Sequence, residues 1–125
     1  MIVLGQGDVM IYSSPVCHVI PTIGLRIEAK SSGKAIVYSC DTEPCQAVIN
    51  LAQEAGTLIH EATGESVGHS SAAQAGETAR DAGVDSLYLI HYSVGDADMA
   101  KLVEEARSTF SGDVRLAEDF MKIVF

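Results

Sequence analysis

The spacing of apolar and polar residues divides the chain into two parts with different patterns. Before residue 40, short β-rich stretches predict strands at 8–13, 23–30 and 35–39. Residues 23–30 alternate apolar and polar side chains, as in a strand with one wet face, whereas residues 35–39 form an apolar run typical of a buried strand. A Ser- and Gly-containing loop at 31–34 predicts a hairpin between the last two strands.

After residue 41 the pattern becomes an alternation of helices and strands. Apolar stripes at helical spacing predict three helices, and short β-rich runs predict four strands between and after them. Gly56 and Gly83 are the expected helix stops, and Met99 heads the inward stripe of the last helix. The expected helices are 43–54, 71–81 and 97–109, and the expected strands are 57–60, 86–92, 114–117 and 121–125. Successive β-α-β units of this kind predict the α/β class.

Size and charge restrict the protein class. The 125 residues predict a single domain, 1–125, large enough for a real core. The net charge of −9, with eight scattered basic residues, argues against a stand-alone nucleic-acid binder. No apolar run approaches the roughly 20 residues that a membrane span needs. The first residues carry no basic charge, so we expect no signal peptide and a cytoplasmic location.

Three cysteines, Cys17, Cys40 and Cys45, are expected to be reduced thiols in that compartment. Their spacing makes no Cys-x-x-Cys pair, so thiol redox chemistry through Cys40 and Cys45 is disfavoured. Cys45 is expected to act as a small apolar residue on a helix face.

Histidines and carboxylates recur where predicted strands end. The carboxyl ends of strands in successive β-α-β units lie on one edge of a sheet, so these side chains are expected to share a rim. Imidazole and carboxylate together suit zinc, iron or manganese. For Asp41 alone, capping of the following helix is the competing interpretation. The residues concerned are His18, Asp41, His60, Glu61, His69 and His91.

Six short strings resemble the motifs of ribonuclease Z and its relatives in the metallo-β-lactamase superfamily, in the same order along the chain. In that order they resemble the third metal-ligand motif, Ser-Gly-Asp-Thr, His-Glu-Ala-Thr, His-Ser-Thr, the last His motif and the closing Ala-x-Asp-Gly turn. The strings lie at 15–27, 38–42, 58–63, 69–72, 89–93 and 116–121.

This resemblance implies a fold and a set of roles. The fold would be half of an αββα sandwich, with one mixed sheet and helices packed on one face. Asp41 would bridge two metal ions, zinc above all, with His18 on the first and His91 on the second. His69, helped by Glu61 or His60, would protonate the leaving oxygen while a metal-bound hydroxide attacks a phosphodiester.

The sequence also departs from the family pattern. No His-x-His occurs in these 125 residues, so the family's His-x-His-x-Asp-His ligands are not among them. Cys40 and Phe120 stand where the family has Gly, and no long basic arm for transfer RNA is present.

Two hypotheses follow from these departures. The chain is a portion of a metal-dependent hydrolase completed by another chain and acting on RNA or a small phosphodiester, or it is an inactive binding or scaffolding module that retains the metal residues. In either case we expect a homodimer or a partner chain over the open sheet face, because an apolar face does not stay exposed.

Overall fold

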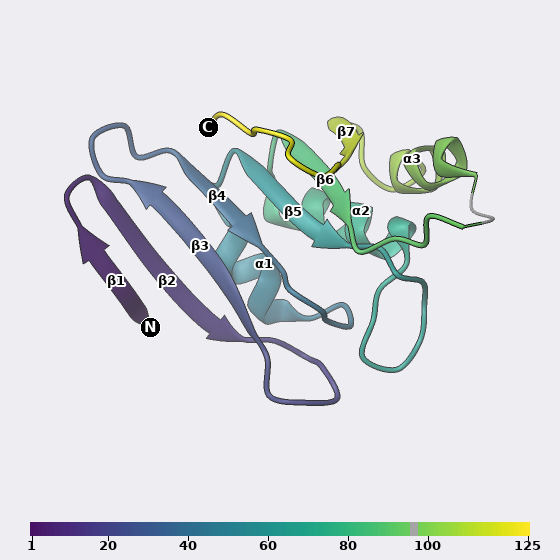
Figure 1. Ribbon diagram of the computed structural model, residues 1–125, viewed down its shortest axis with the longest axis horizontal. Coiled ribbons are helices and arrows are strands. Elements are labelled where there is room, and N and C mark those ends of the chain that lie inside the picture. Colours follow the sequence, from purple (N-terminus) through teal and green to yellow (C-terminus); the bar gives the residue numbers. More distant parts are fainter. Residues whose placement is uncertain (96–97) are drawn as a thin grey trace.

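The computed structural model describes residues 1–95 and 98–125, and it is built on one seven-stranded sheet (Figure 1). The strands lie side by side in the order in which they occur in the chain. They are β1 (Ile2–Gln6), β2 (Val9–Pro15), β3 (Ile23–Ala29), β4 (Ala35–Tyr38), β5 (Thr57–Glu61), β6 (Ser86–Ile90) and β7 (Asp113–Leu116).

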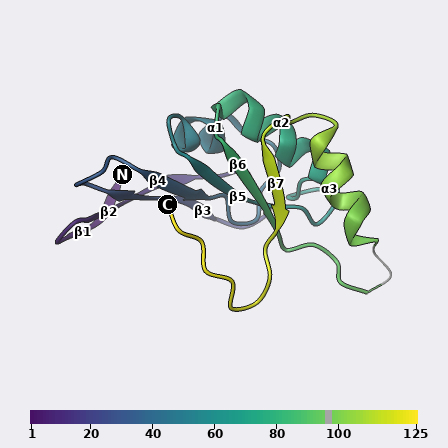
Figure 2. The ribbon, with the colours of Figure 1, turned by 90° about the horizontal axis from the view of Figure 1, so that it is seen from above.

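The sheet is mixed, and its two halves correspond to the two sequence patterns. Strands β1 to β4 pair antiparallel, whereas β4 to β7 pair parallel. The parallel strands are connected by α1 (Gln46–Ala52), α2 (Ala72–Ala82) and α3 (Met99–Arg107). All three helices lie on one face of the sheet (Figure 2). The predicted α/β class, with a mixed sheet and helices on one face, is therefore confirmed.

The core lies between the helices and the parallel strands. Val37, Leu58, Leu87 and Leu89 point into it and are fully buried. The helices contribute mainly alanines, so they approach the sheet and one another closely. At Gly76 of α2, an added Cβ would lie 2.5 Å from the carbonyl oxygen of Ala106 in α3, so only glycine permits this contact.

Two expected elements differ in the structure. The helix expected over 43–54 begins at Gln46, because Cys45 is extended at φ −147°. It ends at Ala52 rather than at Gly56, and Glu54 takes the left-handed conformation at φ +60°. The strand expected over 121–125 does not form, because the chain leaves the sheet after β7 and crosses below it (Figure 2).

The ends of the other elements lie closer to the positions predicted from the sequence, with exceptions. Gly83 ends α2 in the left-handed conformation, as expected. Met99 is exposed rather than buried, because it lies in the first turn of α3. Residue 97, where the third helix was expected to begin, lies outside the described residues. The strand β1 was not anticipated, although it pairs with β2 through a tight turn at Gly7.

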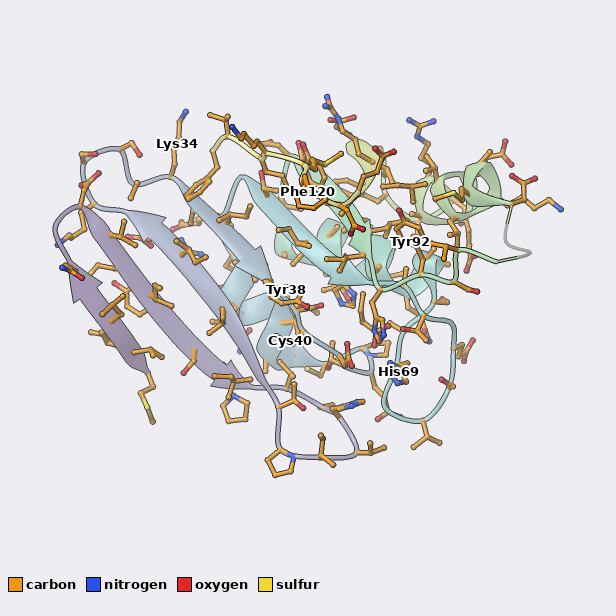
Figure 3. All side chains as sticks on the ribbon, viewed as in Figure 1. Lys34, Tyr38, Cys40, His69, Tyr92 and Phe120 are labelled. Carbon is orange, nitrogen blue, oxygen red and sulfur yellow. The ribbon has the colours of Figure 1, made fainter. Side chains whose placement is uncertain are left out.

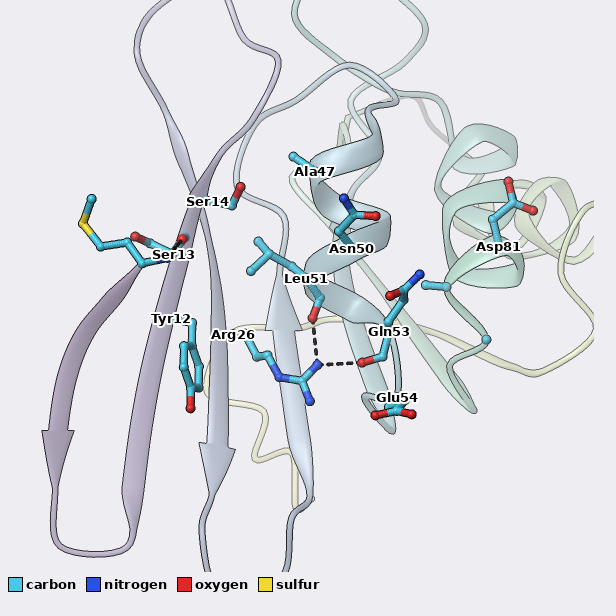
Figure 4. A pocket seen from close by; sticks show the side chains of 13 residues that line it. Tyr12, Ser13, Ser14, Arg26, Ala47, Asn50, Leu51, Gln53, Glu54 and Asp81 are labelled. Atoms are coloured by element: carbon cyan, nitrogen blue, oxygen red, sulfur yellow. Dashed lines mark hydrogen bonds between the residues drawn. The ribbon is translucent and has the colours of Figure 1, made fainter.

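Arg26 attaches the antiparallel strands to the helix layer. Its Nη1 donates hydrogen bonds of 2.8 Å to the carbonyl oxygens of Leu51 and Gln53, which satisfies the open end of α1 (Figure 4). Its Nε donates to Glu28 at 3.1 Å. Arg26, Leu51 and Gln53 border an open groove of about 800 Å³ between α1 and the β2–β3 strands.

Among the described residues, none of the helices has the length and apolar character to cross a bilayer. The cytoplasmic location expected from the sequence stays a prediction.

Candidate metal centre

Two backbone turns bring Asp41 and His91 together at the carboxyl ends of neighbouring strands. Cys40, directly before Asp41, has φ +54°, and His91 itself has φ +56°. Such left-handed conformations are unfavourable for residues with a side chain and tend to occur at functional sites. They end β4 and β6 abruptly, so β6 stops at Ile90 and not at Tyr92. His91 Nδ1 lies 2.9 Å from Asp41 Oδ1 as a result.

The placement of Asp41 excludes the interpretation of this residue as a helix cap. The helix α1 begins five residues later, at Gln46, with Cys45 in the N-cap position. Asp41 lies instead in the turn between β4 and that helix, at the sheet edge where His91 also lies.

His18 reaches this point from the antiparallel half of the molecule. It lies in the loop between β2 and β3, and its Nδ1 donates a 2.7 Å hydrogen bond to the Gly68 carbonyl oxygen. Because Nδ1 carries the proton, Nε2 presents its lone pair, and it lies 4.0 Å from Asp41 Oδ2. A Cβ at Gly68 would lie 2.8 Å from His18 Nδ1, so glycine is needed there.

Glu61 and His69 form a buried pair behind the cluster. The Glu61 carboxylate is fully buried and lies 2.9 Å from His69 Nδ1. It also accepts 3.0 Å hydrogen bonds from the backbone N–H groups of Thr42 and Thr63. Burial acts to raise the pKa of Glu61, but these hydrogen bonds, with one from the Ser70 backbone, outweigh it and lower the pKa. Glu61 is therefore a fixed anion that orients the His69 ring.

His60 points away from this rim. Its side chain is fully buried, and Nδ1 donates to the carbonyl oxygen of Glu61 at 2.8 Å. Burial lowers its pKa, and the contacts with Glu61 oppose this only in part. Among the described residues Nε2 has no hydrogen-bond partner. His60 is thus a neutral ring inside the protein, without access to the cluster.

The remaining imidazoles surround Asp41. Side-chain ligand atoms of Asp41, His69 and His91 all lie within 4.8 Å of one another. The rings of His18 and His69 are 5.0 Å apart between centroids, and those of His69 and His91 are 5.8 Å apart (Figure 3 labels His69). One carboxylate and three imidazoles at this spacing are a donor set that fits a divalent ion such as zinc.

Cys40 adjoins the cluster without joining it. Burial together with the Asp41 charge raises the pKa of its thiol, and the nearby Tyr38 side chain opposes this only in part (Figure 3 labels Tyr38 and Cys40). The thiol is thus held in its protonated form beside the site.

Thr63 is a supporting residue that the sequence analysis did not single out. Its Oγ1 lies 3.2 Å from His91 Nδ1 and donates a 2.9 Å hydrogen bond to the His91 carbonyl oxygen. The only sequence signal was its position at the end of the His-Glu-Ala-Thr string.

The fold is that of a metallo-β-lactamase-type domain. The family model described as "Beta-lactamase superfamily domain" matches residues 11–92. The chain therefore belongs to the β-lactamase superfamily.

Curated relatives narrow the resemblance to ribonuclease Z. The chain is 43% identical over 98 residues to ribonuclease Z of Thermoplasma volcanium, a match that covers 72% of this chain and 32% of that protein. It is 40% identical over 99 residues to ribonuclease Z of Haloarcula marismortui, with the same two shares. The chain thus spans about a third of the length of these relatives.

Solved structures show that the chain has the fold of about half of a metallo-β-lactamase-type protein. The metallo-β-lactamase fold protein YhfI from Bacillus subtilis superposes with a TM-score of 0.82 and 27% identity, over 92% of this chain and 49% of that one. The short form of human tRNase Z has a TM-score of 0.68 and 25% identity, over 96% and 44%. The predicted half of a metallo-β-lactamase fold is therefore confirmed.

Proposed function

We propose that this chain is a portion of a metal-dependent phosphodiesterase of the ribonuclease Z type. The observation that carries the proposal is the convergence of Asp41 with His18, His69 and His91, from four separate segments, on one edge of the sheet. The substrate is a phosphodiester, in RNA or in a small molecule.

In this proposal His18, Asp41 and His91 hold the metal. Zinc is the favoured ion because the donors are imidazole and carboxylate, and manganese or iron would also accept them. Asp41 has one carboxylate oxygen toward His18 and the other toward His91, so it can bridge two ions. When bound, the metal supplies Lewis-acid polarisation of the phosphoryl oxygens and charge neutralisation.

His69 serves as the general acid. Glu61 fixes its Nδ1–H at 2.9 Å, so the ring can present only Nε2 to a substrate on the rim. A proton on that atom would pass to the leaving oxygen, and the buried carboxylate would stabilise the charged ring before transfer. We assign His60 a supporting role, since its buried ring contacts the Glu61 backbone and not the rim.

The site needs further ligands for two-metal activity, and we propose that another chain or segment supplies them. The open sheet face is the surface where a partner half or a second copy would pack. Its apolar side chains alternate with the core residues along the strands and lack a helix above them, and the segment after β7 crosses part of this face (Figure 2). They are Leu4, Ile11, Leu25, Ile27, Tyr38, Ile59, Tyr88 and Ile90.

The alternative is a binding or scaffolding module that no longer turns over substrate. One observation favours it, namely that no His-x-His ligand pair is present in these 125 residues. It would retain the cluster geometry and the partner surface but lack chelator-sensitive activity.

The deciding experiment is metal analysis of chelator-free protein, paired with turnover of bis(p-nitrophenyl) phosphate. The enzyme proposal expects bound metal and turnover that a chelator abolishes. Asp41→Ala should lose both without a change in circular dichroism, whereas Glu104→Ala, at an exposed helix position, should lose neither. Full turnover in Asp41→Ala would refute the site assignment. Metal binding without turnover, even with added zinc or manganese, would support the module.

A further inference from the structure

Cys17 and Cys45 lie together in the structure, although they are 28 residues apart in the sequence. Both residues contact Thr42, and the neighbouring Cys45 side chain is the main cause of the raised pKa of the Cys17 thiol. The hydroxyl of Thr42 lies between them. It accepts from the Cys17 N–H at 3.1 Å and lies 3.6 Å from the Cys45 sulfur.

The backbone around the pair is held in place on both sides. The Glu43 N–H donates a 2.7 Å hydrogen bond to the Cys17 carbonyl oxygen, and Thr42 Oγ1 also contacts that oxygen at 3.3 Å. The two segments therefore cannot separate without loss of these bonds. The Cys17 side chain is exposed, and the Cys45 side chain is half-buried.

From this juxtaposition we infer that Cys17 and Cys45 form a reversible disulfide, which clamps the loop that carries His18 to the turn that carries Asp41. A disulfide requires sulfurs about 2.0 Å apart, so the two side chains must approach each other further. The exposed Cys17 side chain has room to rotate for that closure. The inference does not depend on the metal site, because neither sulfur belongs to the donor set described above.

The oxidant is a small-molecule disulfide such as oxidised glutathione. Cys17 loses its proton to solvent, and its sulfur attacks one glutathione sulfur, which breaks the glutathione S–S bond and expels one thiolate. The Cys45 thiolate then attacks the Cys17 sulfur and expels the second thiolate. The protein loses two electrons and two protons, and one glutathione disulfide becomes two thiols.

The surroundings of Cys45 suit it for the second attack. Burial raises the pKa of its thiol, but hydrogen bonds from Thr42 and from the backbone N–H groups of Val48 and Cys17 outweigh burial and lower the pKa. The side chains that shift the pKa of Cys40 are Asp41 and Tyr38, and neither Cys17 nor Cys45 is among them.

The test is incubation of the folded protein with oxidised glutathione, followed by intact-mass and peptide analysis. We expect a mass lower by two hydrogen atoms and a peptide that links Cys17 to Cys45, both reversed by a dithiol reductant. Cys40→Ser should still form the bond, and Cys17→Ser, at an exposed position, should not. Stable glutathione adducts without the linked peptide, a bond to Cys40, or no oxidation at all would each overturn the inference.

A second readout tests the clamp itself. Because the bond closes a loop that contains β3 and β4, the unfolding midpoint of the oxidised protein should rise by about 5–10 °C. Cys17→Ser should show no such rise under the same treatment. A linked pair without a rise in the midpoint would mean that the bond does not clamp the two segments.

Discussion

The two halves of the sheet differ in how they bury their apolar residues. In the parallel half, Val37, Leu58, Leu87 and Leu89 are fully buried beneath α1 to α3. In the antiparallel half, the apolar residues of β1 are 46–91% exposed when Met1 is counted with them. The parallel half carries its own core, whereas the outer antiparallel strands present an apolar surface. The difference teaches that hydrophobic burial is concentrated in β4 to β7, while β1 and β2 leave apolar side chains exposed.

The same substitution made in both halves tests whether their apolar residues contribute unequally to stability. Leu58→Ala should lower the free energy of unfolding by about 2–5 kcal/mol, because it opens a cavity under the helices. Leu4→Ala removes the same atoms from a residue that is 46% exposed, so we expect about 1 kcal/mol or less. Urea denaturation measures both values.

Repeating the same measurement at several protein concentrations tests whether another molecule covers the face around β1. A Leu4→Ala cost that equals that of Leu58→Ala would show that the face around β1 is covered in solution. If the cost appears only at high protein concentration, a second copy of the chain supplies that cover.

The buried carboxylate of the parallel half gives the next largest effect. Glu61→Gln should destabilise by about 2–4 kcal/mol near neutral pH, because an amide cannot accept from Thr42, Thr63 and His69 together.

The pH dependence of that difference has a definite sign. The folded pKa of Glu61 is lowered from its ordinary value of 4.5, so its stabilisation is present above pH 4.5 and disappears as pH falls through the folded value. Urea midpoints of the wild type and the variant should therefore converge on acidification. A constant difference down to acid pH would contradict an ionised Glu61.

A smaller effect than that of Glu61 is expected at the link between the two halves. Arg26→Met keeps the apolar stem but removes the two hydrogen bonds to the end of α1, so we expect a loss of about 1–2 kcal/mol. Arg26→Lys is the matched control and should retain part of the stability, since an ammonium bridges two carbonyls less well. Amide exchange should speed up at the last turn of α1 in Arg26→Met. Unchanged exchange there would mean that apolar packing alone holds the helix.

Much of the fold was predictable because hydrophobic periodicity is a local property. The buried strands β4 to β6 and the helix ending at Gly83 followed directly from their patterns. The misplaced elements lie where local signals are weak. Residues 121–125 are apolar enough for a strand, but they turn away from the sheet after β7 instead of pairing with it. The shorter α1 reflects the extended conformation at Cys45 and the left-handed Glu54, which an apolar stripe does not encode.

The sequence by itself determined the α/β class, the family resemblance, and that histidines and carboxylates occur at strand ends. The tertiary structure decided which of them meet. Loops of different length carry His18 and His69 to Asp41, while the side-chain alternation of β5 turns His60 into the core and Glu61 toward His69. The approach of Cys17 to Cys45 is likewise a product of packing. The physical reason is that local patterns fix element types, whereas distances between residues far apart in the chain depend on how loops close.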